Sequence, residues 1–346
     1  MTVTDVESLA DSEFEQILHC TDEPTALDSV IVIHDTTLGP SLGGIRMRAY
    51  PDHASATADA KQLAEAMSYK AALAGLKLGG GKSVINAAPD TANRDALLLA
   101  HARRIQSLGG RYIPGIDMGT TVKDLNLVGT VVSTVSSSRL DPSGYTARGV
   151  VAAIRAAVDL TEGHDLSGMR VGIQGLGNVG ARMAAMLAAE GARLVVADVD
   201  EARCRSLAAE LGATVVEPSE ILSADIDVLA PCAAGGVVTA EVAQALTARY
   251  VIGAANNMLA EPRVAATLRE RGIVHVPDFI ANAGGLIACA AEVYNDDSTL
   301  LADVEHIGTT TAEVLLASER HELDTATVAV TLAKQRIAAG RQSSRG

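Results

Sequence analysis

Residues 175–180, Gly-Leu-Gly-Asn-Val-Gly, match the pattern G-x-G-x-x-G, and this motif constrains the fold more than any other part of the chain. An apolar run at 169–174 precedes it and a helix-forming run at 181–190 follows it. A second apolar run, 193–197, ends at Asp198, which lies 23 residues after the first glycine. Strand, glycine turn, helix, strand and acid are the parts of a dinucleotide-binding βαβ unit. A tight turn without a ligand is the structural alternative.

Asp198 also bears on the choice of dinucleotide. A carboxylate at this position accepts hydrogen bonds from ribose hydroxyls and repels a 2′-phosphate, so NAD is expected rather than NADP. The alternation continues with a helix at 201–210 and with strands at 214–216, 226–230, 250–253 and 272–278. Loops after strand ends carry ligands in such sheets. Asn256 follows one of these ends and offers both a donor and acceptors, although an asparagine also suits a left-handed turn.

Length and composition indicate a globular chain of two-domain size. Its 346 residues suffice for two domains, and 48% of them are hydrophobic against 20% charged. There is no Trp and there are only two Phe, so the core is expected to consist of Ala, Val, Leu and Ile. The net charge of −14 argues against nucleic acid as the main partner.

Targeting signals and metal-site patterns are not found in the sequence. Apolar runs fall short of the roughly 18 residues of a membrane span, and the acidic N-terminus does not resemble a signal peptide. The four cysteines form no C-x-x-C pair and the eight histidines form no H-x-x-H or H-x-x-x-H pair. We therefore expect a cytoplasmic protein with reduced cysteines, no metal and no membrane contact.

The stretch 76–85, Leu-Lys-Leu-Gly-Gly-Gly-Lys-Ser-Val-Ile, presents Lys82 after three glycines. A turn is expected over 75–81 and a buried strand over 83–88, which would hold the lysine rigidly. An ammonium in an apolar cleft loses hydration, so its pKa falls and it becomes a candidate general acid/base. A flexible turn with a solvated lysine is the alternative.

A second lysine lies twelve residues earlier, on a helix expected at 55–74 with Ser55 as N-cap. Apolar residues at positions 60, 63, 64, 67 and 71 mark the inner face of this helix. Lys70 lies close to that face and either snorkels to solvent or directs its charge into a cleft. In the second case Lys70 and Lys82 would form one anion-binding site.

Two further features of the first half carry alternatives. Strands are expected at 26–34 and 111–113, with a helix at 92–108 between them. Gly43-Gly44 indicates either a close approach of backbone to a ligand or a hairpin kink. Asp117 follows the strand at 111–113 and is either an active-site acid or a cap for a helix near 121–128. The polar stretch 136–144 is expected to be a hinge before a helix at 146–160.

These motifs together resemble the dehydrogenases that act on glutamate, leucine, phenylalanine and valine, and most closely the leucine/valine/phenylalanine branch. The resemblance runs from about residue 30 to 340 and is carried by LGGIRM at 42–47, MSYKAALAGLKLGGGKSVI at 67–85, DMGTT at 117–121, GLGNVG at 175–180, PCA at 231–233, GAANN at 253–257 and NAGG at 282–285. One departure is the segment 137–145, which is shorter than expected for the branch.

The resemblance implies a role for each matching residue. Lys82 is the catalytic acid/base at the imino carbon, and Asp117 moves a proton at the amino nitrogen. Lys70 binds the substrate carboxylate with the help of the backbone at Gly43 and Gly44. The cofactor residues implied are Arg46, Thr146, Gly175, Leu176, Gly177, Asn178, Val179, Gly180, Asp198, Val199, Cys232, Ala233, Ala254, Ala255 and Asn256. Asn256 is also expected to contact the substrate, and an apolar side-chain pocket is expected from Leu42, Gly115, Leu286 and Cys289.

The implied activity is reversible, NAD-dependent oxidative deamination of an L-amino acid to a 2-oxo acid and ammonia. The implied fold is α/β: a substrate-binding and oligomerisation domain at 1–143, a doubly wound Rossmann domain at 144–297, and C-terminal helices at 298–346 that pack back on the first domain. A homo-oligomer is expected. A dinucleotide-binding sensor without activity is an alternative, and a hydroxy-acid dehydrogenase is another, although no histidine lies in a suitable motif.

The preferred amino acid stays open at this point. Gly115 leaves room for a large side chain and favours phenylalanine, whereas other motifs favour leucine or valine. No cation marks the pocket for a glutamate side chain, but Lys77 and Arg148 keep glutamate as an option.

Overall fold

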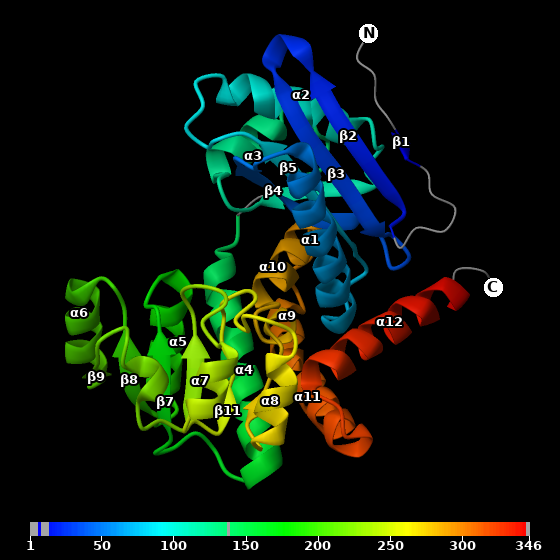
Figure 1. The fold of residues 1–346 in the computed structure, drawn as a ribbon. Helices are drawn as coiled ribbons and strands as arrows, with labels where there is room; N and C mark the ends of the chain where they lie inside the picture. Colours follow the sequence, from blue (N-terminus) through cyan, green and yellow to red (C-terminus); the bar gives the residue numbers. More distant parts are fainter. Residues whose placement is uncertain (1–5, 8–13, 137–138, 344–346) are drawn as a thin grey trace. The chain divides into compact units, whose positions relative to one another are not determined.

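The computed structural model describes residues 6–7, 14–136 and 139–343, and the chain divides into two compact units. Unit 1 comprises residues 1–140, 289–297 and 333–346, and unit 2 comprises 141–288 and 298–332. Figure 1 shows that each unit has its own sheet. Within the described part of the chain, no helix is long and apolar enough to cross a membrane. The domain boundaries expected from the sequence, 143/144 and 297/298, stay a proposal beside this division.

The sheet of unit 1 has six strands in the order β1-β2-β3-β5-β4-β6. They are β1 (Val6–Glu7), β2 (Gln16–Asp22), β3 (Leu27–Asp35), β4 (Ser41–Arg48), β5 (Gly79–Asn86) and β6 (Tyr112–Ile116). Strand β4 runs parallel to both β5 and β6, whereas β3 is antiparallel to β5. The sequence analysis did not foresee β2, which pairs with β3 along its whole length. The carboxyl ends of β4, β5 and β6 therefore lie at one edge of the sheet.

Helix α1 (His53–Leu73) covers one face of this sheet with small side chains. Ala56, Ala60 and Ala64 are buried against Val30, Val32 and Val84 of the strands. The expected N-cap, Ser55, is wrong: Asp52 caps the helix, and its carboxylate accepts a hydrogen bond from the Ser55 backbone N–H at 2.7 Å. Aspartate is a strong N-cap, because its side-chain oxygen accepts from an otherwise unpaired amide of the first turn.

The expectation of a glycine turn over 75–81 is wrong in its second half, because Gly79, Gly80 and Gly81 form the start of strand β5. A Cβ on Gly80 would lie 2.0 Å from the backbone nitrogen of Ser68 in α1. A Cβ on Gly79 would lie 1.9 Å from the Asp35 carbonyl oxygen, and one on Gly81 would lie 2.8 Å from the Tyr112 ring. The glycines thus provide close packing around the strand rather than flexibility.

The other face of the sheet is covered by α2 (Arg94–Gln106) and α3 (Val122–Val128). A short 3-10 helix, η1 (Glu23–Thr25), joins β2 to β3. The core on this side contains Ile31, Ile33, Met47, Ile85 and Leu98. Aliphatic residues dominate it, as the lack of Trp and the two Phe of the sequence predict.

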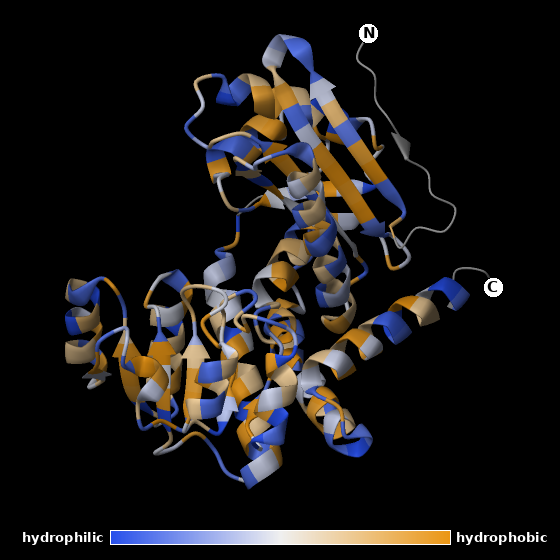
Figure 2. Cartoon of the chain, viewed as in Figure 1, coloured by the Kyte–Doolittle hydropathy of each residue, from blue (hydrophilic) through white to orange (hydrophobic). Residues whose placement is uncertain are grey.

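The sheet of unit 2 is entirely parallel in the order β12-β11-β10-β7-β8-β9. Its strands are β7 (Arg170–Gln174), β8 (Arg193–Ala197), β9 (Thr214–Val215), β10 (Val228–Pro231), β11 (Tyr250–Val251) and β12 (Val274–His275). The strand order reverses between β7 and β10, which is the arrangement of a doubly wound dinucleotide-binding sheet. Figure 2 shows hydrophobic residues along these strands, as expected for a sheet covered on both faces.

The helices that cover this sheet alternate with its strands. They are α4 (Pro142–Glu162), α5 (Asn178–Ala189), α6 (Glu201–Leu211), the 3-10 helix η2 (Ile221–Ser223), α7 (Ala240–Ala245), α8 (Val264–Glu270) and α9 (Asp278–Ala281). Three helices complete the chain, α10 (Gly284–Tyr294), α11 (Leu300–His321) and α12 (Thr325–Ser343). Helix α11 packs closely on α4, where a Cβ on Gly308 would lie 3.2 Å from the Ala152 carbonyl oxygen.

The expected hinge at 136–144 is shorter than predicted, because α4 begins at Pro142 rather than at Thr146. Asp141 is its N-cap and accepts from the Ser143 amide at 3.0 Å, and Pro142 occupies the first helical position. Proline suits this position, since its missing N–H would be unpaired there in any case. Residues 137–138 of the expected hinge lie outside the described residues.

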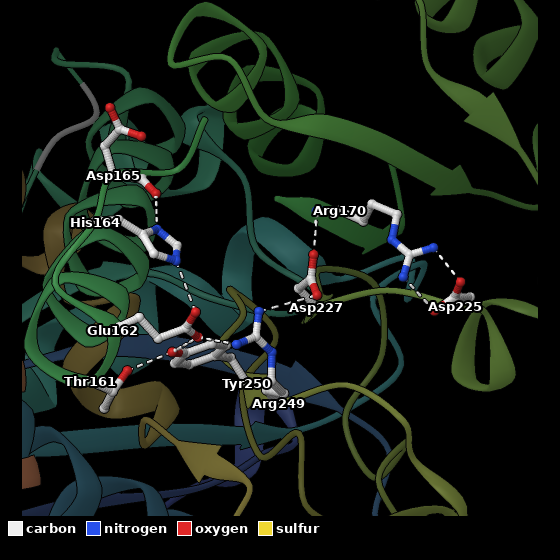
Figure 3. A network of polar contacts seen from close by, with 9 residues as sticks. All are labelled: Thr161, Glu162, His164, Asp165, Arg170, Asp225, Asp227, Arg249 and Tyr250. Atoms are coloured by element: carbon white, nitrogen blue, oxygen red, sulfur yellow. Dashed lines mark hydrogen bonds and ion pairs between the residues drawn. The ribbon is translucent and has the colours of Figure 1, made fainter. Parts of the chain in front are cut away.

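A network of charged groups lies where β7, β10 and β11 begin (Figure 3). Glu162, the last residue of α4, accepts hydrogen bonds from the Tyr250 hydroxyl at 2.5 Å, from His164 at 2.9 Å and from Arg249. Asp227 accepts from Arg249 at 3.2 Å and from the Arg170 amide at 2.8 Å. Burial raises the pKa of Glu162, but hydrogen bonds from Tyr250, Arg249 and His164 outweigh it and lower the pKa to about 2.

We expect Glu162→Gln to destabilise the protein at pH 7 by about 1.5–3 kcal/mol, the usual contribution of hydrogen bonds to a charged group. The lowered pKa makes the contribution of Glu162 complete above its ordinary value of 4.5, and this contribution is lost as the pH falls toward about 2. The stability gap between wild type and variant, measured by urea unfolding, should therefore narrow from pH 7 to pH 3.5. Glu210→Gln, at an exposed position on α6, is the control and should open no gap. A gap that stayed constant with pH would contradict this account of Glu162.

Candidate active site

Lys82 lies in β5 and is almost completely buried, with 5% of its surface exposed. Its Nζ lies 2.7 Å from Oδ2 of Asp117. Because side chains alternate along a strand, Lys82 shares a face with Gly80, the residue on which α1 packs. The alternative of a flexible turn with a solvated lysine is therefore excluded.

The Lys82–Asp117 pair has shifted proton affinities. Burial lowers the pKa of Lys82; Asp117 opposes this shift, and the positive charge of Arg46 adds to it. Burial alone would raise the pKa of Asp117, but Lys82 and Arg46 outweigh burial, so the net pKa is lowered. Asp117 is thus a carboxylate at neutral pH, and Lys82 releases its proton more readily than a solvated lysine. This is the property required of a general base.

The backbone around Asp117 is fixed by the loop that follows β6. The Thr120 hydroxyl accepts from the Asp117 amide at 3.0 Å and donates to the Ile45 carbonyl at 2.8 Å. The capping alternative for Asp117 is wrong, because Thr121 caps α3 in a capping box with Asp124. Asp117 is therefore not used as a helix cap.

Gly43 and Gly44 lie inside β4, so the hairpin-kink alternative is also wrong. A Cβ on Gly43 would lie 1.8 Å from the Gly81 carbonyl oxygen, and one on Gly44 would lie 2.6 Å from Cβ of Asp117. The buried Tyr112 hydroxyl donates to the Gly43 carbonyl at 2.7 Å and holds this backbone in place. The two glycines let β4 pack tightly beside the lysine–aspartate pair.

Lys70 lies in the last turn of α1 and is half-buried. It follows Ser68 by two residues, and Lys82 follows Gly80 by two residues. Ser68 and Gly80 are in direct contact, as the 2.0 Å between the Ser68 nitrogen and a Cβ on Gly80 shows. Each lysine thus lies two residues after a member of the contact between Ser68 of α1 and Gly80 of β5. The role of Lys70 as the carboxylate-binding residue stays a prediction.

Arg46 joins Asp117 to a second acid that the sequence analysis did not single out. Its Nε donates to Oδ2 of Asp117 at 2.8 Å, and its Nη1 donates to Oδ2 of Asp59 at 2.9 Å. Asp59 lies on α1, and the Tyr50 hydroxyl also donates to it. The sequence gives no local sign of this contact, because Asp59 resembles any polar helix residue. The cofactor role expected for Arg46 stays a prediction.

The candidate side-chain pocket gains one residue. A Cβ on Gly115 would lie 3.8 Å from Cβ of Ser136, which is buried. Burial raises the pKa of the Cys289 thiol, and the nearby Ser136 hydroxyl partly offsets this. Gly115, Ser136 and Cys289 thus lie together in unit 1, where Leu42 is also buried. Ser136 was assigned to a hinge because only the fold brings it beside Gly115. Leu286, the last expected pocket residue, lies in α10 within unit 2.

In unit 2, the glycine motif forms the turn between β7 and α5. Gly175 has φ of +96°, and its amide donates to the Ala197 carbonyl at 2.7 Å. A Cβ on Gly180 would lie 1.9 Å from the Gly175 carbonyl oxygen, whereas no described atom lies within 4 Å of a Cβ placed on Gly177. The open space at Gly177, at the start of α5, fits the approach of a pyrophosphate to the helix amides. Leu176, Asn178 and Val179 complete this turn and the start of the helix.

Asp198 lies directly after β8, beside this turn. Its carboxylate accepts from the Leu176 amide at 2.6 Å and from the Asp200 amide at 2.9 Å. Burial raises its pKa, but these amides and Arg203 outweigh burial and the net pKa is lowered. Arg203 lies 3.6 Å from the carboxylate. An ionised carboxylate at this strand end fits the recognition of ribose hydroxyls, and Val199 follows it at an exposed position.

The loop after β10 packs on the glycine turn. The Cys232 amide donates to the Gln174 carbonyl at 2.7 Å, and Ala233 lies so close that its Cβ would be 2.6 Å from a Cβ on Gly175. The loops after β7 and β10 meet where the strand order reverses, which is the usual ligand position of this fold.

Asn256 lies in the loop after β11. The Ala254 and Ala255 amides both donate to the Pro231 carbonyl at 2.9 Å, and Asn282 donates to the Asn256 side-chain oxygen at 2.9 Å. The left-handed alternative for Asn256 is wrong, because the neighbouring Asn257 has φ of +51° instead. The Asn256 side chain is thus oriented by an amide partner.

Thr146 lies in the first turns of α4, and its hydroxyl donates to the Pro142 carbonyl at 2.9 Å. The hydroxyl oxygen is also 2.7 Å from a Cβ placed on Gly285. All four cysteines of the chain are free, and no cluster of metal-binding side chains is found in the described part of it.

Comparison with known proteins agrees with this arrangement. The family model of the Glu/Leu/Phe/Val dehydrogenase dimerisation domain matches residues 15–134, and that of Glutamate/Leucine/Phenylalanine/Valine dehydrogenase matches 138–204 and 196–341. The chain is 41% identical to leucine dehydrogenase of Bacillus cereus over 99% of this chain and 96% of that protein. It is 40% identical to valine dehydrogenase of Streptomyces albus over 94% of this chain and 93% of that protein.

The crystal structure of L-tryptophan dehydrogenase from Nostoc punctiforme has the same fold, with a TM-score of 0.88 at 37% identity over 95% of this chain and 97% of that one. Dehydrogenases of this family use a nicotinamide dinucleotide, and the sensor alternative is not favoured. The chain belongs to the Glu/Leu/Phe/Val dehydrogenase family and is an amino-acid dehydrogenase of its leucine/valine branch.

Proposed function

We propose that the protein catalyses the reversible, NAD-dependent oxidative deamination of an L-amino acid with an apolar side chain. The products are the 2-oxo acid and ammonia. The observation that carries this proposal is the buried pair of Lys82 and Asp117, 2.7 Å apart, in which burial lowers the lysine pKa. Proton transfers to and from water and nitrogen require such a base near neutral pH.

The chain's residues divide the chemistry as follows. Lys70, with the backbone at Gly43 and Gly44, binds the α-carboxylate, and Asp117 takes a proton from the amino group. When bound, the nicotinamide accepts the hydride from Cα. Lys82 then removes a proton from the water that adds to the imino carbon and passes it to solvent. As the carbonyl forms, Lys82 takes the hydroxyl proton, and Asp117 returns a proton to the nitrogen that leaves as ammonia. Each step uses a proton acceptor or donor that the Lys82–Asp117 pair supplies.

Asp198 supports NAD as the dinucleotide. Its carboxylate is ionised and is held by two backbone amides, so it repels a 2′-phosphate while it accepts from ribose hydroxyls. Arg203 is the nearby cation, and Asp198 and Asp200 already neutralise it at 3.6 and 3.3 Å. Arg46, Thr146, Val199, Cys232, Ala233, Ala254, Ala255 and Asn256 remain proposed cofactor residues.

Gly115 supports a large apolar substrate side chain. Its missing Cβ leaves the space in front of Ser136 open, and Leu42 and Cys289 of the same unit are expected to line the pocket. Leu286 remains a proposed substrate-binding residue. Arg148, which kept glutamate as an option, pairs with Glu305 at 3.1 Å in unit 2. This pairing supports phenylalanine, leucine or valine more than glutamate, and Lys77 remains the cation that keeps glutamate as an option.

We also propose a cytoplasmic homo-oligomer without nucleic-acid partners. The match of residues 15–134 to a dimerisation-domain model supports assembly through the first domain. The net charge of −14 supports the absence of nucleic acid.

A panel of amino acids tests the proposed function directly. We expect the absorbance of reduced cofactor to rise with NAD and leucine, valine, phenylalanine or tryptophan at alkaline pH, and to rise little with glutamate. NADP at equal concentration should support a much lower rate. If no amino acid of the panel raised the absorbance, the proposed activity would be refuted. Faster turnover with NADP than with NAD would refute the role assigned to Asp198.

Two substitutions separate the roles of the lysines. Lys82→Ala should lower kcat at least 1,000-fold, a loss at the level expected for a base that also orients water. It should leave NAD binding unchanged. Lys70→Ala should mainly raise the amino-acid KM, because it removes a carboxylate partner. A Lys82→Ala variant with near wild-type kcat would refute the assignment of the base.

Two glycines of the same motif form a matched pair for cofactor binding. Gly177→Ala places a methyl group where no described atom lies within 4 Å, so the protein should keep its stability but bind NAD about 10-fold more weakly. Gly180→Ala places one 1.9 Å from the Gly175 carbonyl and should lower the melting temperature. Calorimetry and thermal unfolding measure the two effects. Unchanged NAD affinity in Gly177→Ala would contradict the proposed pyrophosphate position.

A further inference from the structure

Asp59 contacts the proposed catalytic residues only through Arg46, which pairs with both Asp59 and Asp117. A continuous row of alternating charges runs through unit 1: Asp59 on α1, Arg46 on β4, Asp117 after β6 and Lys82 on β5. The three ion pairs measure 2.9, 2.8 and 2.7 Å in that order. Four elements thus contribute one charge each, and the row ends at the proposed base.

Asp59 is connected to this row on two sides. Its Oδ2 accepts from Arg46 Nη1 at 2.9 Å and also from the Tyr50 hydroxyl. Burial raises the pKa of Tyr50 to about 12, and the hydrogen bond with Asp59 adds to this shift, so Tyr50 remains a donor at any working pH. Asp59 is therefore itself held in place.

We propose that Asp59 is a positioning residue for the reaction: with Tyr50 it holds the Arg46 guanidinium against Asp117, and thereby fixes the Lys82–Asp117 pair. This proposal rests on the deamination activity proposed above.

The geometry of Arg46 supports the proposal. Its side chain is 14% exposed, and its Nε and Nη1 atoms face two different carboxylates. A long arginine side chain loses considerable rotamer freedom when it is fixed, so two partners hold it better than one. Without Asp59, Arg46 would keep a single acidic partner in this row, and its contact with Asp117 would loosen.

The charges also support it. The charges of Asp117, Arg46 and Asp59 all act on Lys82. Asp117 and Asp59 favour the charged lysine, whereas Arg46 disfavours it. On the neighbouring β6, Tyr112 donates to Gly43 and stays protonated because burial raises its pKa. Removal of the Asp59 charge alone should therefore make Lys82 release its proton at lower pH.

Asp59→Asn tests the charge, because an asparagine oxygen still accepts from Arg46 and Tyr50. We expect the acid limb of the kcat–pH profile for oxidative deamination to move about 0.5–1 unit to lower pH, the size of shift that one charge several ångströms away produces. The plateau kcat should stay within a few-fold of wild type.

Asp59→Ala tests the positioning, because it removes the acceptor as well. We expect kcat to fall about 10- to 100-fold, the cost of small misplacement of a reacting group, with the NAD affinity unchanged. Glu65→Gln is the matched control: it removes one negative charge from the same helix and keeps an acceptor for the Tyr69 hydroxyl. Its pH profile should equal that of wild type.

The outcomes are distinguishable. A wild type inactive with the whole panel would overturn the proposed function and this inference together. An active wild type whose pH profile is shared by Asp59→Asn would overturn only the inference. The same holds if both Asp59 variants merely melt at lower temperature while kcat and pH profile are unchanged. If Asp59→Ala does not fold, the profile of Asp59→Asn decides.

Discussion

The close approach of α1 to β5 determines where the chemical groups of unit 1 lie. At Gly80 the strand has no side chain, and the backbone of Ser68 occupies the space that a Cβ would need. Gly79 and Gly81 make similar contacts with β3 and with the Tyr112 ring. The constraint is steric, because a side chain at Gly80 would force α1 away from β5. Asp59 and Lys70 are both carried by α1, so their positions depend on this contact.

The second constraint is electrostatic. Lys82 is a buried cation, and a buried charge is stable only when partners compensate its lost hydration. Asp117 and Asp59 provide this compensation and Arg46 opposes it; the four charges alternate, so the group as a whole carries no net charge. Removal of any one member leaves an uncompensated charge, which costs several kcal/mol in buried pairs. This fixed arrangement keeps Lys82 shielded from water, and burial keeps the pKa of its ammonium group below the usual value.

The dinucleotide-binding half of the fold is readable from the sequence because its signals are local. The strand before Gly175, the helix after it and the acid at Asp198 all lie within one short stretch, and each element forms where the pattern predicts it. Pro142 after Asp141 was also a local signal for the start of α4. It was outweighed by the polar composition of the surrounding stretch.

The features that could not be predicted from the sequence depend on contacts between residues that are distant in the chain. Glycine is depleted in strands, so the run Gly79–Gly81 favours a turn until α1 and Tyr112 are seen to fill the space around it. Asp59 and Ser136 carry no motif of their own, and only the fold brings them to Arg46 and to Gly115. Lys82 could be singled out from its sequence context, but its burial and its partner had to come from the structure.

The two edges of the parallel sheet in unit 2 serve different purposes. The loops proposed to bind the dinucleotide follow the carboxyl ends of β7, β8 and β10, whereas the network around Glu162 connects the starting ends of β7, β10 and β11. Substitutions at the starting ends of these strands can therefore change the stability of unit 2 without touching the loops proposed to bind the cofactor. Adaptation to temperature and adaptation of catalysis become separable problems in this chain.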